Sequence, residues 1–384
     1  MDKIDPICGM KGTIKSHGHY FCSKHCISKY EKQHNITKDE CPSCSVKPKK
    51  WYKERLFIVG LIVIILLIIS YLIPFLNPFF DSLIDYIKLI WWAVLLGFLL
   101  GGIIDYFVPN KYIQKYLSRH RKRTIVYSIV FGFLMTACSH GILAIAIELY
   151  KKGANTSSVI SFLLASPWAN LPITILLFGF FGLKSILIIF SALFIASTTG
   201  LIYQSLERKG MVECRHCEMG EDKPVLTDFS IIEDVKVRWE DYDFTKKNSL
   251  KALKGTITGS WALTKMVMWW LLIGMVMAAF ARAYVPHGLF LEYMGPTLLG
   301  LCVTLVFATL IEVCSEGSSP LAFEISNQTG AFGNSFTFLM AGVATDYTEI
   351  GLIWHNIGKK AALWLPVITV PQIIILGYLF NIFL

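Results

Sequence analysis

Two short segments of the chain carry the same reactive groups at the same spacing, and both lie inside apolar sequence. They align without a gap from position 138 to 170 and from 314 to 346. The shared thiol, hydroxyl, glycine and carboxylate are Cys138, Ser139, Gly141 and Glu148 in the first segment and Cys314, Ser315, Gly317 and Glu324 in the second. Ionisable groups are costly within a membrane, so they are functional candidates there by default. Thiolates are soft ligands that suit Cu(I), Zn(II) or trivalent arsenic, and a carboxylate in each segment can carry protons against such a substrate.

The rest of the candidate pathway comes from other corresponding positions. His140 and Glu316 occupy the same position with different chemistry, so the two segments are not equivalent there, and Asn170 corresponds to Asp346. The predicted transport pathway consists of Cys138, Ser139, His140, Glu148, Asn170, Cys314, Ser315, Glu316, Glu324 and Asp346. The alternatives are that a membrane cysteine is only a small buried apolar residue, and that the two glutamates extend to the membrane surface from helix ends.

The elements that hold these residues are predicted to be membrane helices. Hydrophobic residues make up 54% of the 384 residues, above the roughly 45–50% of soluble proteins. Apolar runs of about 20 residues, the length that spans a bilayer, recur near 56–75, 88–107, 124–149, 157–180, 184–204, 261–284, 297–325, 333–354 and 361–383. A transmembrane barrel would alternate with a period of two instead. The sequence therefore predicts an all-α polytopic membrane protein.

Composition divides the chain into five regions. Residues 1–46 form a polar, cysteine-rich metal-binding domain, 47–80 hold a basic collar and the first membrane helix, and 205–258 form a charged cytoplasmic linker. The regions 81–204 and 259–384 are predicted to be two permease repeats, because internal repeats of this size are typical of transporters built from two halves. The repetition extends upstream to Trp91, Trp92 and Gly97 in the first repeat and Trp269, Trp270 and Gly274 in the second.

Positive charge predicts which helix ends face the cytoplasm. The basic loop 110–123 and the linker 205–258 are both predicted to be cytoplasmic, as is the N-terminus. The loop, the linker and the N-terminus can all be cytoplasmic if the run 124–149 is a re-entrant hairpin broken at its Cys-Ser pair, with a matching hairpin in the run 297–325. This gives seven full spans plus two hairpins, in two half-repeats of inverted topology. The alternative is nine plain spans with parallel halves.

Cysteines outside the apolar runs predict metal binding rather than disulfides, because these regions are predicted to be cytosolic. They are Cys8, Cys22, Cys26, Cys41 and Cys44 near the N-terminus and Cys214 and Cys217 in the linker. The first three can fill three ligand positions of a zinc or copper site, with a nearby histidine or the Cys41–Cys44 pair as the fourth. The alternatives are a purely structural zinc site and, for the linker pair, a redox role or disorder.

The N-terminal pattern resembles small YHS/TRASH-type heavy-metal-binding modules. The resemblance rests on the stretch Asp5-Pro6-Ile7-Cys8-Gly9-Met10 followed by Phe21-Cys22-Ser23 and Cys26. It implies that three cysteines hold a Zn or Cu ion there.

The membrane part resembles a predicted permease family that includes ArsP-type organoarsenical exporters. The Cys-Ser-x-Gly segments and the stretch 153–170 carry this resemblance, and the N-terminal module with the Cys-x-x-Cys linker resembles the Cu/Zn efflux subgroup. The resemblance covers about 88–383 and implies an inner-membrane exporter with Cys138 and Cys314 as substrate contacts. His140 departs from the arsenical exporters by standing where another cysteine is expected, which favours a metal ion.

Together these observations predict a secondary-active efflux permease for a soft cation, Cu or Zn, in the cell membrane. No enzyme activity is predicted, and the absence of a phosphate-loop motif and of an Asp-Lys-Thr-Gly motif argues against ATP-driven transport. Glu148 and Glu324 are the candidates for proton coupling, and a metallochaperone is a candidate partner.

The net charge of +9 is interpreted as membrane-flanking charge rather than as a nucleic-acid surface. The alternatives are export of trivalent arsenicals and a membrane metal sensor without transport.

Overall fold

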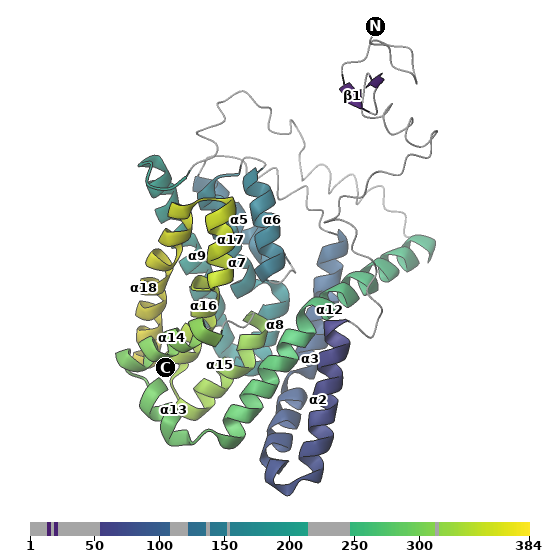
Figure 1. The fold of residues 1–384 in the computed structure, drawn as a ribbon, viewed down its shortest axis with the longest axis vertical. Coiled ribbons are helices and arrows are strands. Elements are labelled where there is room, and N and C mark those ends of the chain that lie inside the picture. The colour runs from purple at the N-terminus through teal and green to yellow at the C-terminus, as the bar shows by residue number, and fades with distance from the viewer. Residues whose placement is uncertain are drawn as a thin grey trace. The chain divides into compact units, whose positions relative to one another are not determined.

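The computed structural model divides the chain into two compact units, Met1–Glu54 and Arg55–Leu384. It describes residues 14–16, 19–21, 54–107, 122–135, 139–151, 154–213, 246–311 and 315–384. In the first unit, β1 (Ile14–Ser16) pairs antiparallel with β2 (His19–Phe21). The described part of the second unit is built from helices (Figure 1).

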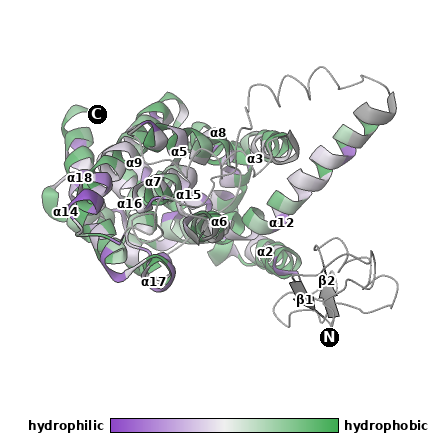
Figure 2. Cartoon of the chain, turned by 90° about the horizontal axis from the view of Figure 1, so that it is seen from above, coloured by the Kyte–Doolittle hydropathy of each residue, from purple (hydrophilic) through white to green (hydrophobic). Residues whose placement is uncertain are grey.

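Long apolar helices form the frame of the second unit. They are α2 (Arg55–Leu72), α3 (Asn77–Phe107), α9 (Ser185–Arg208), α12 (Lys246–Tyr284) and α18 (Lys359–Phe383), with the short η2 (Pro74–Leu76) between α2 and α3. In the described part of the chain, five helical segments are long and apolar enough to cross a membrane, or six if the pair α13 (His287–Met294) and α14 (Leu298–Ile311), bent by 105°, is one span. Figure 2 shows hydrophobic residues along these helices, and Ile64 and Ile68 of α2 are each 55% exposed. Exposed apolar side chains at this density are suited to lipid, which confirms the prediction of a multi-pass helical membrane protein.

Between the long helices, the chain forms two series of short helices. They are α5 (Lys122–Leu134), α6 (Ser139–Lys151), α7 (Thr156–Ala169) and α8 (Leu171–Phe181), then, after α14, α15 (Ser315–Thr329), α16 (Phe332–Ala344) and α17 (Tyr347–Asn356). At a rise of 1.5 Å per residue, helices of 10 to 15 residues are about 15–22 Å long, short of the roughly 30 Å hydrocarbon core. Each is therefore about half a span.

The positions of the helix breaks agree with the sequence in part. The runs 124–149 and 297–325 are both interrupted near their Cys-Ser pairs, as predicted. The runs 157–180 and 333–354, each expected to be one span, are also divided, at Asn170 and before Tyr347. Prolines lie on both sides of the first break, Pro167 in α7 and Pro172 at the start of α8, whereas the break before Tyr347 was not predicted. The cause of both is a polar side chain that caps the second helix, as described below.

Helices α5 and α6 form a pair that returns to the end of the unit at which it begins. A Cβ atom on Gly200 of α9 would lie 1.9 Å from Ser161 of α7 and 3.0 Å from Ile125 of α5. Further along, a Cβ atom on Gly132 of α5 would lie 3.0 Å from Ala165 of α7. Helices α5 and α7 therefore run side by side in the same direction. Since short segments join α6 to both of them, α6 must run back.

Helices α14 and α15 form a second pair of this kind. The side-chain amide of Asn334, at the start of α16, donates to the carbonyl of Met294 before α14 (2.8 Å), and the hydroxyls of Thr309 and Thr345, at the ends of α14 and α16, are 2.7 Å apart. Helices α14 and α16 therefore run in the same direction. Helix α15 connects them and turns into α16 through Gly330, whose φ of 66° lies in the left-handed region that glycine adopts without strain.

The two pairs open towards opposite ends of the unit. The Gly333 amide at the start of α16 donates to Asn381 at the end of α18 (2.8 Å). At the other end of α18, the Tyr203 hydroxyl of α9 donates to the carbonyl of Ala361 (2.6 Å), and Glu207, one turn further along α9, accepts from the first turn of α7 (3.0 Å). The start of α7 and the start of α16 are thus at opposite ends (Figure 1).

The core of the unit forms around the short helices. Every residue of α7 is buried, and α7 packs against α5 and α9, while α16 packs against α14 and α18. Helix α15 packs against α12 so closely that a Cβ atom on Gly274 would lie 1.9 Å from the carbonyl oxygen of Gly317. Only glycine fits at such a backbone approach, so Gly274 of α12 allows the start of α15 to pack this closely.

Candidate functional site

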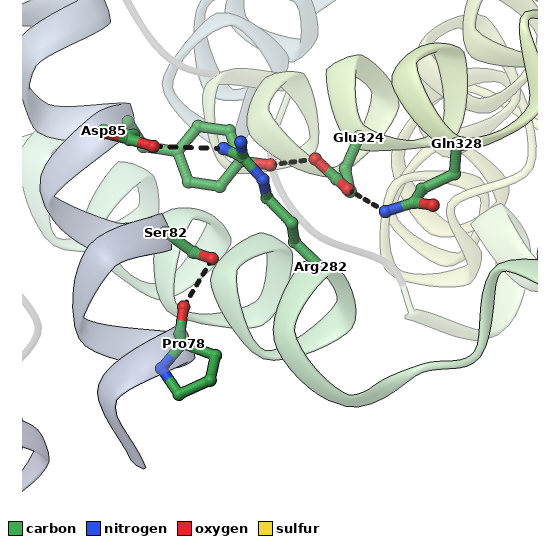
Figure 3. A network of polar contacts seen from close by, with 7 residues as sticks. Pro78, Ser82, Asp85, Arg282, Glu324 and Gln328 are labelled. Carbon is green, nitrogen blue, oxygen red and sulfur yellow. Dashed lines mark hydrogen bonds and ion pairs between the residues drawn. The ribbon is translucent and has the colours of Figure 1, made fainter. Parts of the chain in front are cut away.

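Glu324 lies at the centre of a buried polar network between α3 and α15. The side chain is 1% exposed. The hydroxyl of Tyr86 on α3 donates to one carboxylate oxygen, and the amide of Gln328, one turn along α15, donates to the other at 2.7 Å (Figure 3). Removing a carboxylate from water costs several kcal/mol unless hydrogen bonds compensate, and these two donors supply them. The alternative that Glu324 extends to the membrane surface is therefore wrong for this residue.

A cation and a second carboxylate complete the network. The guanidinium carbon of Arg282, near the end of α12, lies 5.8 Å from the centre of the Tyr86 ring, a position suited to a cation–π contact. Arg282 also forms an ion pair with Asp85 of α3 at 3.7 Å (Figure 3). Both partners are partly exposed, at 40% and 58%, so this pair lies at the outer side of the network.

An open cavity of about 440 Å³ adjoins the network. Its wall is formed by Asp85, Tyr86, Lys88, Leu89, Arg282, Phe323 and Asn327. Glu324 is absent from this wall, whereas Tyr86 belongs to it and also donates to Glu324. Tyr86 therefore connects the cavity wall to the buried carboxylate.

A second group of predicted residues lies at the start of α15. Glu316 is 4% exposed, and Ser315 donates a hydrogen bond to its carboxylate at 3.3 Å. Glu316 borders a narrow space that Pro172, in the first turn of α8, and Gly97 of α3 also line. The first turns of α8 and α15 therefore lie near each other. Helix N-termini carry partial positive charge, which favours a carboxylate at this position.

Asn170 and Asp346 are N-terminal caps. The Asn170 side chain accepts from the amide of Ile173 in α8 at 2.8 Å. Asp346 accepts from the amides of Thr348 and Glu349 in α17 at 2.7 and 3.0 Å. Such caps satisfy backbone donors that a helix start leaves unpaired. The matched positions thus share a structural role, and a direct role in transport stays a prediction.

The structure brings together only part of the predicted pathway. Ser315, Glu316 and Glu324 share α15, and Glu316 approaches α8 just beyond Asn170. Cys138 and Cys314 lie outside the described residues, as do Cys8, Cys22, Cys26, Cys41, Cys44, Cys214 and Cys217. Ser139, His140 and Glu148 belong to α6, but their side chains are outside the described set. No group of three or more His, Cys, Asp or Glu residues that could hold a metal occurs within the described ranges.

Sequence reasoning missed the other members of the network around Glu324. Tyr86, Arg282 and Gln328 were not predicted, although Arg282 lies inside the apolar run 261–284, where a charged residue is a functional candidate. Tyr86 is 238 positions from Glu324, and no spacing rule connects the two.

The arrangement can hold one proton out of the solvent. A buried carboxylate with one hydroxyl donor and one amide donor can bind or release a proton as its surroundings change. The open cavity beside the network is the side on which a proton could enter or leave. Such an ionisable group between membrane helices is typical of proton relays in transporters.

Comparison with known proteins supports a transporter class rather than an enzyme class. Residues 76–382 match the family of predicted permeases named ArsP_1. The UPF0718 protein MJ0584 of Methanocaldococcus jannaschii is 24% identical over 340 residues, covering 76% of this chain and 92% of that protein. The UPF0718 protein YcgR of Bacillus subtilis is 24% identical over 289 residues, covering 74% and 90%.

A protein of Streptococcus mutans, named as a candidate subunit of a two-component membrane permease complex, is 22% identical over 274 residues, covering 70% of this chain and 83% of that protein. No solved structure matches the chain. The family match extends from η2 to the last turn of α18 and includes the Glu324 network, so this chain belongs to the ArsP_1 family of predicted permeases.

Proposed function

We propose that this permease is a secondary-active exporter of a soft metal cation, copper or zinc, that exchanges the metal for protons across the cytoplasmic membrane. The observation that carries the proposal is the buried carboxylate of Glu324, which lies on the helix that begins directly after Cys314. Exchange requires a metal ligand and a proton carrier. Cys314, directly before α15 in the sequence, and Glu324, within α15, are proposed to fill these two roles.

The metal is proposed to bind at the paired thiols. Cys138 directly precedes α6 and Cys314 directly precedes α15, and thiolates are the ligands that soft cations prefer. Ser315 and Glu316, which follow Cys314 directly in the sequence, are proposed to add harder oxygen ligands.

The two halves are proposed to be an inverted duplication. The pairs α5–α6 and α14–α15 open towards opposite ends of the unit, and α7 and α16 pack in corresponding ways. In such folds, broken helices from the two faces meet near the middle of the membrane. Within this scheme the starts of α2, α7 and α18 face the cytoplasm, as the positive-inside rule suggests.

The topology has a direct test. A single cysteine introduced at Lys151, in a variant that lacks the native cysteines, is expected to react with an impermeant maleimide only after the membrane is opened. A cysteine introduced at Leu183, which is 80% exposed in the turn η3 (Gly182–Lys184), is the matched control and is expected to react from outside in intact cells. Labelling at both positions from outside would exclude the inverted arrangement.

Two further parts of the proposal concern partners. The N-terminal cysteines are proposed to bind Zn or Cu and to receive metal from a chaperone before transfer to the membrane site. The relative named as part of a two-component complex makes a second membrane subunit a further candidate partner. Metal analysis of the purified full chain tests the first point, because the proposal requires bound Zn or Cu that is lost when the N-terminal cysteines are replaced.

The transport proposal is tested in inside-out membrane vesicles. With an acidic interior, vesicles that contain the protein are expected to accumulate Cu(I) or Zn(II) faster than empty-vector vesicles, and collapse of the pH gradient should abolish the difference. Arsenite is offered in parallel. Uptake of arsenite with no uptake of either metal would replace the metal proposal with arsenical export, and no uptake of any of the three would favour a sensor.

A further inference from the structure

We propose that Tyr86 is the residue that positions the proton of Glu324 and closes this carboxylate off from the open cavity. The inference rests on the proposed proton exchange, and it assigns the outward gate of that exchange to a residue that the sequence did not single out. Tyr86 belongs both to the cavity wall and to the hydrogen-bond network of Glu324.

The ring of Tyr86 is held in one orientation by its neighbours. Phe180 of α8 and Phe323 of α15 contact it edge-on, with ring centres 6.5 and 6.4 Å away. Aromatic pairs prefer such edge-to-face geometry and gain about 0.5–1.5 kcal/mol from it. Tyr86 itself is only 1% exposed. The hydroxyl is therefore aimed at Glu324 by packing and not only by its own hydrogen bond.

Arg282 covers the ring from the side of the cavity. Its guanidinium carbon lies 5.8 Å from the ring centre of Tyr86, and its ion pair with Asp85 anchors it there. Arg282 thus places a positive charge beside the route by which a proton would approach.

In this geometry a proton can pass from the cavity to Glu324 without leaving a charge on Tyr86. When a proton arrives on a water molecule in the cavity, the Tyr86 oxygen binds it while the original hydroxyl proton moves to the Glu324 carboxylate. The phenol is neutral before and after, and Glu324 becomes a neutral acid. The reverse step returns the proton to the cavity. Breaking the Tyr86–Glu324 hydrogen bond would interrupt both directions, which is the action of a gate.

The other titratable and charged groups around Glu324 are few within the described residues. On α3 they are Asp85 and Lys88, on α12 Arg282, and on α13 His287, which reaches Glu324 only through Gln328 (3.0 Å to the Gln328 oxygen). Helices α8 and α16 carry none. The hydroxyl of Tyr86 is the titratable group that touches the carboxylate directly.

The test uses a reagent that reports the protonation of Glu324 without requiring transport. Dicyclohexylcarbodiimide modifies protonated carboxyl groups in apolar surroundings, and mass spectrometry of the full-length protein in membranes gives the labelled fraction of Glu324 at each pH. Tyr86→Phe keeps the ring contacts and removes the donor. Because this donor bonds the carboxylate directly, its loss is expected to change the labelling midpoint, the pH at which half of Glu324 is labelled.

The matched control is Tyr71→Phe, which removes a hydroxyl from a tyrosine on α2 that is 70% exposed, and it is expected to leave the midpoint unchanged. Tyr86→Ala provides the second measurement, because a water-soluble carbodiimide should reach Glu324 in this variant and not in the wild type. An unchanged midpoint in Tyr86→Phe, an equal shift in Tyr71→Phe, or exclusion of the water-soluble reagent from Tyr86→Ala would each overturn the proposal.

Failure of this inference and failure of the proposed function give different results. If Glu324→Gln retains full pH-driven transport, proton exchange at Glu324 is excluded whatever the labelling shows. If Glu324→Gln loses that transport while Tyr86→Phe leaves the labelling midpoint unchanged, proton exchange stands and the gate does not.

Discussion

Glu324→Gln is expected to lower pH-driven metal uptake into inside-out vesicles by more than about tenfold, because relay groups of this kind contribute factors of 10²–10⁴. The amide has nearly the same shape as the carboxyl group, and its oxygen can still accept from one of the two donors, Tyr86 or Gln328, which bond different oxygens of the carboxylate. It cannot release a proton, so the metal loses its driving force while the fold is kept. The measurement is the initial rate of Cu(I) or Zn(II) uptake at fixed pH gradient.

The same variant allows a loss of proton coupling to be distinguished from a loss of structure. Metal–metal exchange without a pH gradient needs no net proton movement, so it is expected to persist in Glu324→Gln. Glu292→Gln, which changes an exposed carboxylate on the neighbouring helix α13, serves as the matched control and should keep both activities. Full pH-driven uptake by Glu324→Gln would exclude this carboxylate as the coupling group.

Replacing either repeated thiol is the second large expected effect. Cys138→Ser and Cys314→Ser each exchange a soft sulfur ligand for a hard oxygen that binds Cu(I) and Zn(II) poorly. We expect each variant to lose metal resistance in a host without other efflux pumps, and the affinity for the transported metal to fall by about 10²-fold, in line with the loss of one good ligand. Growth against metal concentration and vesicle uptake measure the two effects.

The control for the thiols is Cys302→Ser. Cys302 lies on α14, is exposed, and has no counterpart in the first segment. It is expected to keep resistance and uptake. If Cys138→Ser and Cys314→Ser keep resistance and uptake as Cys302→Ser does, the repeated cysteines are ordinary buried apolar residues. The metal site must then be sought elsewhere.

The sequence predicted the helical membrane class and the breaks at both Cys-Ser pairs, because hydropathy and the positions of basic residues can be read from the sequence directly. It did not predict the break at Asp346. A single aspartate in an apolar run gives no sign that it will accept from two backbone amides of the next helix. Asn170 and Asp346 were grouped by their matching positions, and the feature they share in the structure is helix capping.

Glu324 shows most clearly what the sequence determined and what only the tertiary structure decided. The sequence by itself determined that a carboxylate repeats at the same distance after each thiol, and that an ionisable group in an apolar segment must have a function or a partner. Only the tertiary structure decided which partners it has, because Tyr86 reaches it from a helix far away in the chain, and Arg282 in turn packs over the Tyr86 ring. The physical reason is that a buried charge needs donors and a dielectric environment that arise from packing between helices, and no local pattern in the sequence encodes that packing.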